Sequence, residues 1–401
     1  MPNLTLLYRI QPAVPQAHLF AVEIEVPDTG ASELRLSMPA WIPGSYMIRD
    51  FARNLVTLDA ACGDRPVAVR KLDKQTWQCS GVSGPLSVRY DVYAWDLSVR
   101  GAHLDPTHGY FNGPCVFLAV QGMETRPCEV EIRAPGGADY AGWKVATTLE
   151  PGELTEGGFG RYRASDYADL IDHPVEMGEF NEFSFPVRGV EHRLAITGRH
   201  RVDGERLCTD LARICEQQAR LFGTLPLRRY LFLITAVGDG YGGLEHRDCT
   251  SLMCQRDHLP QPGQSAVSEG YRRFLALCSH EYCHLWNVKR IRPAVFAENA
   301  LDREVHTRLL WAFEGITSYY DELCLVRSGC IDQKGYLQLL AEGITRVVRS
   351  PGRFKQSLAE SSFDAWTKFY KQDENAPNAL VSYYTKGALV ALALDLTLRQ
   401  R

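Results

Sequence analysis

The chain has 401 residues, of which 45% are apolar and 23% are charged, and its formal net charge is −4. This length suits two or three domains, and the ordinary composition excludes a disordered or fibrous protein. The small net charge, without a long basic or acidic run, argues against a dedicated nucleic-acid or membrane-surface binder. No apolar run reaches the length of a membrane span.

The amino terminus and the cysteines bear on the compartment. The first residues, MPNLTLLYRIQPAVP, lack a charged segment ahead of an apolar core, so they do not have the pattern of a signal peptide. Twelve cysteines are scattered along the chain without a CxxC pair. Together these features predict a cytoplasmic protein with reduced thiols rather than a disulfide framework.

The first part of the chain, residues 1–175, is predicted to form a β-domain. Apolar side chains occupy every second position in four short segments, 20–26, 33–38, 86–92 and 128–134. Such alternation, with Gly and Pro in the connections, is typical of half-buried strands. The pattern indicates an antiparallel β-sandwich.

The second part, residues 176–401, is predicted to be mostly α-helical with a small sheet of its own. Two strand-like segments, HRLAITG and YLFLITAV, flank an amphipathic helix whose apolar stripe runs from Leu207 to Phe222, with Gly223 as its stop. Further helices are predicted at 266–288, 303–327, 334–348 and 383–400. The sequence therefore predicts an α+β protein of two domains.

A motif near the end of the predicted helix 266–288 suggests a metal site. In HEYCH, His280 and His284 are four residues apart, so both side chains project from one face of a helix and can reach one ion. Glu281 can then lie beside a water molecule at the metal and accept its proton. The alternative is an ordinary helix with two surface histidines, because two ligands do not hold a catalytic zinc.

A third ligand is expected from the next helix, where Glu304 and Glu314 are the acidic candidates. Glu314 lies in WAFEGITSYYDEL, whose apolar and aromatic residues indicate a well-packed helix. Glu304 lies in LDREVHTR and fits a first-turn charge that complements the helix dipole. We therefore expect Glu314 to be the ligand, and His306 to be a surface residue.

The stretch HEYCHLWNVKRIRP followed by WAFEGITSYY closely resembles the glycyl aminopeptidase family of zinc metallopeptidases, which belongs to the gluzincins. Three further stretches are similar, in the family's order: WIPGSYMIRDFARN (41–54), YGGLEHRDCTSL (241–252) and SYYTKGALVALALDL (382–396). The resemblance covers nearly the whole chain and implies a thermolysin-like catalytic domain. The sequence departs from the family pattern in ending before the PDZ region that family members typically carry.

The resemblance also implies a role for each residue of the catalytic centre. His280, His284 and Glu314 correspond to the ligands of one Zn²⁺ per chain, and Glu281 corresponds to the general base. Tyr384 corresponds to the tyrosine that hydrogen-bonds the developing oxyanion, which is sound chemistry for a phenol. From the residues alone, Tyr384 is better explained as an amphipathic tyrosine at a helix start, and its neighbour Tyr383 is the second candidate.

The segment GYGGLEH is the expected substrate-binding element. Gly242 and Gly243 permit close backbone approach, so an extended peptide can pair alongside the strand. The resemblance implies that Glu245 binds the free α-amine of the substrate, with His246 as a lesser candidate. Without the resemblance, this segment is a turn with a solvated glutamate.

Other polar residues keep two interpretations. Asp321 is either a carboxylate that orients a ligand histidine or a surface residue. Lys289, Arg290 and Arg292 either meet a substrate carboxylate or complement a helix end. Cys283 is expected to pack rather than to bind zinc. Five histidines show no metal-binding spacing: His103, His108, His173, His192 and His200.

These features predict a zinc-dependent aminopeptidase that removes small N-terminal residues, Gly or Ala, from peptides with a free N-terminus. No nucleic-acid or membrane partner is expected. Two alternatives stay open. One is an endopeptidase or oligopeptidase with the same zinc site, and the other is a catalytically weak scaffold that keeps zinc for structure.

Overall fold

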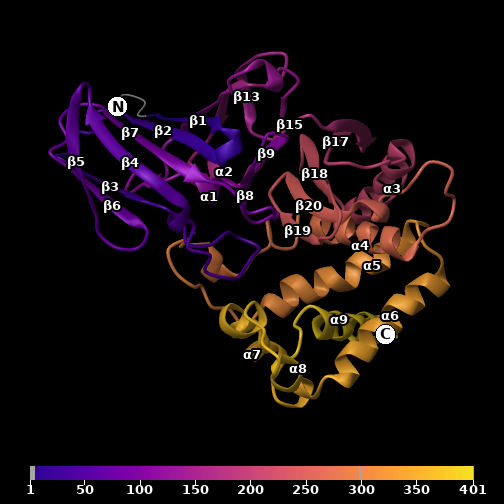
Figure 1. Ribbon diagram of the computed structural model, residues 1–401. Coiled ribbons are helices and arrows are strands. Elements are labelled where there is room, and N and C mark those ends of the chain that lie inside the picture. Colours follow the sequence, from indigo (N-terminus) through magenta and orange to yellow (C-terminus); the bar gives the residue numbers. More distant parts are fainter. Residues whose placement is uncertain (1–4, 298–299, 401) are drawn as a thin grey trace. The chain divides into compact units, whose positions relative to one another are not determined.

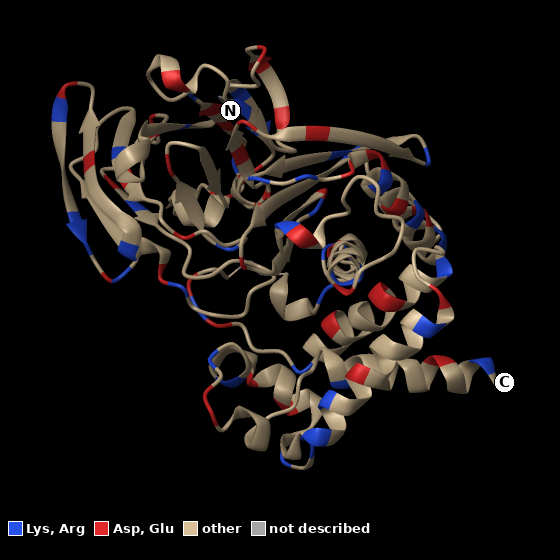
Figure 2. Cartoon of the chain, turned by 45° about the vertical axis from the view of Figure 1, so that its right-hand side comes forward, with Lys and Arg blue, Asp and Glu red and all other residues tan. Residues whose placement is uncertain are grey.

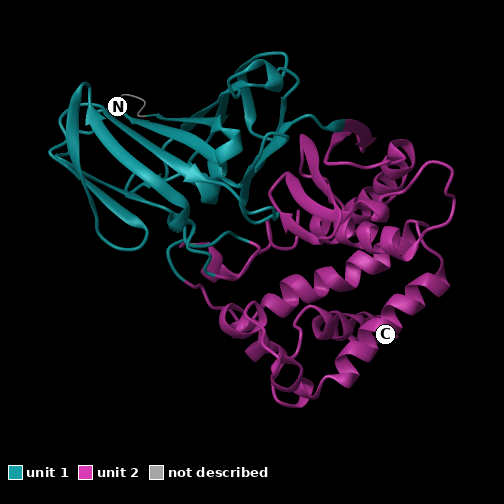
Figure 3. Cartoon of the chain, in the orientation of Figure 1, with its two compact units in different colours: residues 1–43, 48–181, 301–303 teal, residues 44–47, 182–300, 304–401 magenta. Residues whose placement is uncertain are grey.

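The computed structural model describes residues 5–297 and 300–400 and shows an α+β fold, as expected (Figure 1). The chain divides into two compact units (Figure 3): unit 1 comprises 1–43, 48–181 and 301–303, and unit 2 comprises 44–47, 182–300 and 304–401. Among the described helices, none combines the length and the apolar character that a membrane span requires. Lys and Arg (blue) and Asp and Glu (red) are scattered along the chain among other residues (Figure 2).

Unit 1 is built on two sheets. The larger sheet has the order β10-β3-β6-β5-β4-β7-β2-β1-β11-β14-β13, and the smaller sheet has the order β12-β15-β9-β8. The strands are β1 (Leu6–Val14), β2 (Leu19–Val26), β3 (Glu33–Ser37), β4 (Leu55–Cys62), β5 (Arg65–Lys71), β6 (Thr76–Ser80), β7 (Leu86–Tyr93), β8 (Ala102–Leu104), β9 (His108–Phe111), β10 (Ala119–Val120), β11 (Cys128–Ile132), β12 (Lys144–Ala146), β13 (Glu150–Leu154), β14 (Gly160–Ala164) and β15 (Val175–Gly178). Two short helices, α1 (Gly113–Val116) and α2 (Tyr167–Ile171), complete the unit.

The alternating pattern predicted these strands correctly where one face is buried. In β2, Phe20, Val22, Ile24 and Val26 are each at most 2% exposed, whereas the residues between them are not buried. Strands β7 and β11 show the same alternation of burial. Strand β1 runs parallel to β11, an exception to the antiparallel pairing expected of this region.

Unit 2 contains a five-stranded sheet of order β16-β17-β18-β20-β19. Its strands are β16 (Asn181–Val187), β17 (Val190–Thr197), β18 (Arg229–Val237), β19 (Gly242–Glu245) and β20 (Cys249–Gln255). The central strands β17, β18 and β20 are parallel, and β19 is antiparallel to β20 at one edge. Residues 230–234 of β18 are all at most 2% exposed, as expected for a strand covered on both faces.

The helices of unit 2 are α3 (Gly204–Phe222), α4 (Glu269–Cys283), α5 (Ile316–Arg327), α6 (Gln333–Arg349), α7 (Leu358–Phe363), α8 (Ala376–Ala379) and α9 (Thr385–Arg399). Helix α3 ends at Gly223, whose φ of 81° is left-handed, so the predicted stop is correct. Helices α3, α4 and α5 share one apolar core with strands β17, β18 and β20.

The prediction of one helix over 303–327 is wrong in its first third. The backbone is irregular up to residue 309, a π-helical turn covers Trp311–Gly315, and α5 follows. The carbonyl of Val305 accepts a hydrogen bond from Trp366 Nε1 at 3.1 Å, and the Trp311 amide donates to Ser362 Oγ at 3.0 Å. Tertiary partners therefore take up backbone groups that a helix would have paired internally.

Candidate active site

Helix α4 brings the two motif histidines to its last turn. The helix starts after Ser268, whose hydroxyl caps the amide of Tyr271 at 3.1 Å. His280 lies in the final turn, and His284 is the C-cap residue, whose amide still donates to the His280 carbonyl. The imidazole centroids are 4.6 Å apart, so the spacing places both rings over one point, as the motif predicts.

Glu314 reaches the same point from the π-helical turn before α5. Its Oε2 lies 3.4 Å from His280 Nε2 and 3.2 Å from His284 Nε2, and the residue is only 2% exposed. The three donor atoms fall within 4.8 Å of one another, a grouping that could hold one metal ion. A π-turn is a frequent device at functional sites because it rotates one side chain out of the α-helical register.

Both imidazoles are held through their other ring nitrogen. Nδ1 of His280 is 2.8 Å from Asp321 Oδ2, and Nδ1 of His284 is 2.8 Å from the carbonyl of Asn287. Since each acceptor fixes a proton on Nδ1, Nε2 is the ring nitrogen that faces Glu314 and that would bind a metal ion in place of a proton. Asp321 is therefore not a surface residue: it is buried and holds the ring of His280.

Asn287 is a site residue that the sequence reasoning missed. Its side-chain amide donates to the carbonyl of Phe313 at 2.9 Å and to Thr317 Oγ1 at 3.0 Å. It thereby joins the end of α4 to the turn that carries Glu314, while its own carbonyl holds His284. Its position three residues after the second histidine was the only signal in the sequence.

The electrostatics of the three donors show mutual attraction. Burial raises the pKa of Glu314, but the neighbouring charge of His284 and hydrogen bonds from both histidines outweigh it, so this pKa lies well below its usual value. Burial lowers the pKa of His284, and the charges of Glu314 and Glu245 reverse that effect and raise it. The carboxylate is therefore ionised, and the cluster favours positive charge at its centre.

The carboxyl group of Glu281 lies next to His284, one of the three donor residues. It is 5% exposed, and its Oε2 has no hydrogen-bond partner among residues 5–297 and 300–400. Burial is the main cause that raises the pKa of Glu281 to about 7, against the opposing effect of the two histidines. A Cβ atom built on Gly243 would lie 2.5 Å from the Glu281 Cδ, so the absence of a side chain in β19 makes room for this carboxyl group.

Glu245 is the last residue of edge strand β19 and is 4% exposed. A carboxylate oxygen of Glu245, one of Glu281 and a nitrogen of His284 lie within 4.8 Å of one another. Gly44, in the short segment 44–47 of unit 2, has φ +91°, and a Cβ there would lie 2.7 Å from Glu245 Cδ. Gly44 is thus a second residue that sequence reasoning missed, although it lies in the quoted stretch WIPGSY.

Tyr384 precedes α9 and lies beside the histidines. Its ring centroid is 6.1 Å from that of His280, and its hydroxyl is 3.4 Å from the Tyr370 hydroxyl. Tyr383 is fully buried and packs on Phe369 with a centroid separation of 4.7 Å. Of the two tyrosines, Tyr384 therefore has the better position to meet a substrate.

Comparison with known proteins agrees with this geometry. A model of the peptidase M61 N-terminal domain matches residues 7–179, and a model of M61 glycyl aminopeptidase matches residues 273–390. A crystal structure of an aminopeptidase N family protein from Idiomarina loihiensis is 45% identical, with a TM-score of 0.97, and covers 99% of this chain and 67% of that chain. The chain belongs to the M61 glycyl aminopeptidase family. This M61 protein is accordingly a metallopeptidase, and the expected family resemblance is confirmed.

More distant structures share the fold of the M61 protein. An M1 zinc metallopeptidase from Deinococcus radiodurans is 14% identical, with a TM-score of 0.56, over 98% of this chain and 83% of that chain. A mutant of that enzyme bound to a Tyr-Ser-Ala substrate is 16% identical, with a TM-score of 0.54. No curated protein shows significant similarity to this chain.

The remaining candidates of the M61 protein have structural partners or lie at the surface. Arg290 donates to the carbonyls of Leu285 at 2.7 Å and Pro226 at 2.9 Å, so its guanidinium joins loop segments. Cys283 is 1% exposed and packs in the interior, as expected. Glu304 and His306 are exposed, and His306 contacts the Phe363 carbonyl at 2.9 Å.

Proposed function

We propose that this M61 protein is a zinc-dependent aminopeptidase that removes Gly or Ala from the N-terminus of peptides. The observation that carries the proposal is the convergence of His280, His284 and Glu314, each within hydrogen-bond range of another. Two imidazoles that present Nε2 to one point, together with one buried carboxylate, form the donor set of a catalytic zinc site. Zinc bound there would polarise a carbonyl group and make water nucleophilic near neutral pH.

Glu281 is the proposed general base. Its carboxylate lies beside the donor cluster, and one oxygen has no hydrogen-bond partner among the described residues. The raised pKa of about 7 suits a group that must first accept a proton from the attacking water and then deliver it to the leaving amine. Burial of the carboxyl, rather than a charged partner, keeps it available for both steps.

Tyr384 is the proposed donor to the oxyanion. Its phenol lies beside His280, and burial together with the charge of Glu314 raises the pKa of Tyr384 far above the working range. The hydroxyl therefore keeps its proton and can donate it to an oxygen that becomes negative only in the transition state. Tyr370, 3.4 Å away, adds a second hydroxyl that can hold Tyr384 in place.

Glu245 is the proposed ligand of the substrate α-amine. It is a buried carboxylate close to both Glu281 and His284, at the end of an edge strand. Gly242 and Gly243 in that strand can accept an extended substrate by backbone pairing, which places the N-terminal residue against Glu245. The carboxylate oxygens of Glu245 and Glu281 lie within 4.8 Å of one another. An amine held by Glu245 would therefore place the first peptide bond beside the base, which favours removal of a single residue.

The preference for small residues rests on the aromatic side chains that crowd this end of the site. The Tyr46 ring packs against Tyr370 at 6.0 Å and against Phe296 at 5.7 Å between centroids. Burial, followed by the charges of Glu314 and Glu245, raises the pKa of Tyr46. We expect these packed rings to limit the size of the substrate side chain beside the amine anchor.

The proposal is tested by hydrolysis of glycyl-, alanyl- and phenylalanyl-p-nitroanilide, with zinc quantified on the same sample. We expect turnover of the first two substrates, loss of turnover in Glu281→Gln with zinc retained, and no cleavage of N-acetylated substrates. Cleavage of blocked peptides would instead indicate an endopeptidase. Stoichiometric zinc without turnover of any free-amine substrate would indicate a scaffold.

A further inference from the structure

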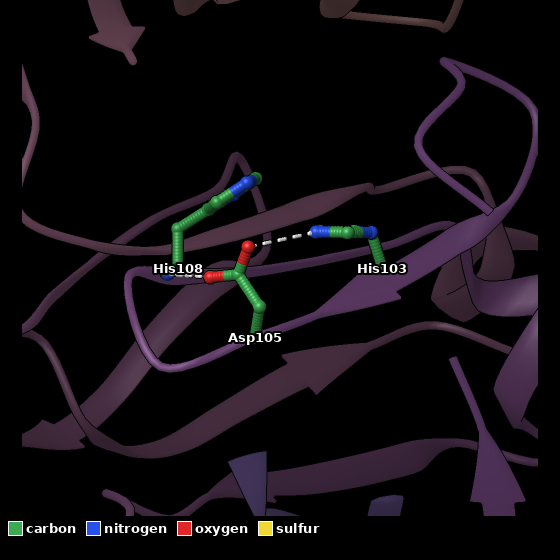
Figure 4. Close-up of side chains that lie close together, drawn as sticks. All are labelled: His103, Asp105 and His108. Atoms are coloured by element: carbon green, nitrogen blue, oxygen red, sulfur yellow. Dashed lines mark hydrogen bonds and ion pairs between the residues drawn. The ribbon is translucent and has the colours of Figure 1, made fainter. Parts of the chain in front are cut away.

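A second cluster of metal-binding side chains lies in unit 1, within the hairpin of β8 and β9. His103 is in β8, Asp105 is in the turn, and His108 is the first residue of β9 (Figure 4). Their donor atoms fall within 4.8 Å of one another. These residues were not expected to bind a metal, because the sequence HLDPTH does not follow a helical ligand spacing.

The hairpin register explains why the three side chains meet. Residue 103 pairs with Tyr110 and residue 104 pairs with Gly109, in antiparallel register. Side chains two apart in a strand share a face, so His103 and Asp105 face the same side as Tyr110 and His108. The imidazole centroids of His103 and His108 are 5.0 Å apart with an interplanar angle of 34°. Strand periodicity therefore assembles the ligands here, as helical periodicity does at the first site.

The Asp105 carboxylate is oriented toward the cluster by the turn. Its Oδ1 accepts hydrogen bonds from the Thr107 amide at 2.6 Å, the Thr107 hydroxyl at 2.6 Å and the His108 amide at 3.1 Å. The other oxygen, Oδ2, is thereby turned to His103 Nε2 at 3.2 Å, a contact drawn in Figure 4. One carboxylate oxygen is used by the backbone, and the other is available to a cation.

A buried carboxylate holds His108 in the way that Asp321 holds His280. Glu176, in β15 and 2% exposed, lies 3.0 Å from His108 Nδ1 through Oε1. This contact places the proton on Nδ1 and leaves the Nε2 lone pair for a ligand. Metal-bound histidines commonly show this carboxylate–imidazole pair.

His103 is costly as a purely structural residue. It is 3% exposed, and its Nδ1 has no hydrogen-bond partner in the described part of the chain. A buried polar group without a partner destabilises a fold by about 1–3 kcal/mol; a cation at Nε2 leaves Nδ1 unpaired, but the energy of the metal bond would compensate for burying this ring. Asp105 is partly exposed, and residues 106–107 are exposed, so an ion and a water ligand can enter through the turn.

We infer that unit 1 binds a second divalent transition-metal ion of the zinc class. The ligands are His103 Nε2, Asp105 Oδ2 and His108 Nε2, oriented by Glu176. Two imidazoles and one carboxylate select zinc or cobalt over the hard cations magnesium and calcium. The ion links β8, the turn and β9, so it stabilises the hairpin by mass action. This site is separate from the proposed catalytic zinc and does not depend on it.

The experiment uses the full chain with both catalytic histidines replaced, His280→Ala and His284→Ala, so that only the second site remains. The protein is stripped with a chelator and titrated with Co²⁺, whose visible absorption reports nitrogen and oxygen ligation, and then with Zn²⁺. We expect one saturable equivalent and a melting temperature that rises with zinc concentration. Absence of a saturable equivalent would overturn the inference.

Variants in the same background identify the ligands. Asp105→Asn keeps the oxygen that caps the turn but should abolish saturable binding, as should His108→Gln. Glu176→Gln should weaken the affinity about 10–100-fold. The matched control is His173→Gln, because His173 is also buried in unit 1 beside a carboxylate but belongs to none of the metal-binding groups found among the described residues. The control should bind one equivalent unchanged.

Folding of each variant is checked by its melting curve in excess chelator. If the double-alanine background does not fold, the ligand variants are made in the otherwise unchanged chain, and the expected result becomes two equivalents in the parent and one in each variant. Undiminished binding in both Asp105→Asn and His108→Gln would place the metal elsewhere and refute the assignment.

Discussion

Substitution of Gly243 by alanine tests whether the backbone of β19 positions the proposed general base. An added Cβ would lie 2.5 Å from Glu281 Cδ and 2.7 Å from its Cγ, whereas ordinary contact begins at about 3.4 Å. The Glu281 carboxyl must therefore move by about 1 Å. A misplacement of that size at a reacting group costs about 10²-fold in rate. We expect kcat to fall by about that factor, and zinc content to be unchanged.

The assay is steady-state hydrolysis of glycyl-p-nitroanilide, with zinc measured on the same preparation. The matched control is Gly238→Ala in the connection before β19, where the nearest atom to an added Cβ is the end of the Arg256 side chain at 3.8 Å. The control should keep the parent kcat. Because the same change of residue type is made in the same part of the unit, loss of activity in Gly243→Ala alone cannot be assigned to general loss of stability.

The separate effects on kcat and KM show whether the substitution displaces the base or weakens substrate binding. A displaced base lowers kcat and kcat/KM together, since its interaction is made in the transition state. A parent-like kcat in Gly243→Ala would refute the proposed contact between β19 and Glu281. Loss of zinc in that variant would also refute it, because the structure places the clash on the base and not on the three ligands.

Four further outcomes are expected. Asp321→Asn should raise the zinc dissociation constant about 10–100-fold by loosening His280, and an unchanged constant in chelator competition would contradict that role. Glu245→Gln should lower kcat/KM for glycyl-p-nitroanilide by about 30-fold or more, the usual cost of removing one partner of a buried charge pair; equal activity would exclude Glu245 as the amine ligand. Gly387→Ala should destabilise the fold by about 1–3 kcal/mol through overpacking, to be read as a lower melting temperature. Burial lowers the pKa of His192 to about 4, so the unfolded state binds more protons between pH 6.5 and 4, and stability should decrease by up to about 3 kcal/mol as the pH falls through that window; His192→Gln should flatten this part of the urea-unfolding profile.

Regular elements with one buried face could be predicted from the sequence. Helices α3, α6 and α9 and strands β2, β7 and β11 lie close to the predicted segments because their apolar periodicity reports the side on which they pack. The irregular segment 303–310 could not be predicted, because its charged residues suit a helix start while its backbone bonds to Trp366. Propensity is a weak guide where tertiary contacts decide the conformation.

In the candidate site, too, some residues could be predicted from the sequence and others could not. Residues that carry chemistry, such as His280 and Glu314, have side chains whose type and spacing indicate a role. Glycines that leave space for these reactive side chains have no recognisable sequence pattern, and Gly44 is an example. The contact that excludes a side chain at Gly44 comes from Glu245, about 200 positions later in the chain. No local pattern reports a contact at that separation.

Glycines set the distances between the elements that assemble this site. The π-helical turn that carries Glu314 ends at Gly315, where a Cβ would lie 2.6 Å from the Cα of Gly387 in α9. This backbone-to-backbone contact brings the start of α9, and with it Tyr384, to the turn that carries Glu314, the proposed third ligand. A larger residue at either glycine would push this turn and α9 apart, and with them Glu314 and Tyr384. The positions that determine catalytic geometry here are thus those without side chains, and a survey of reactive residues alone would overlook them.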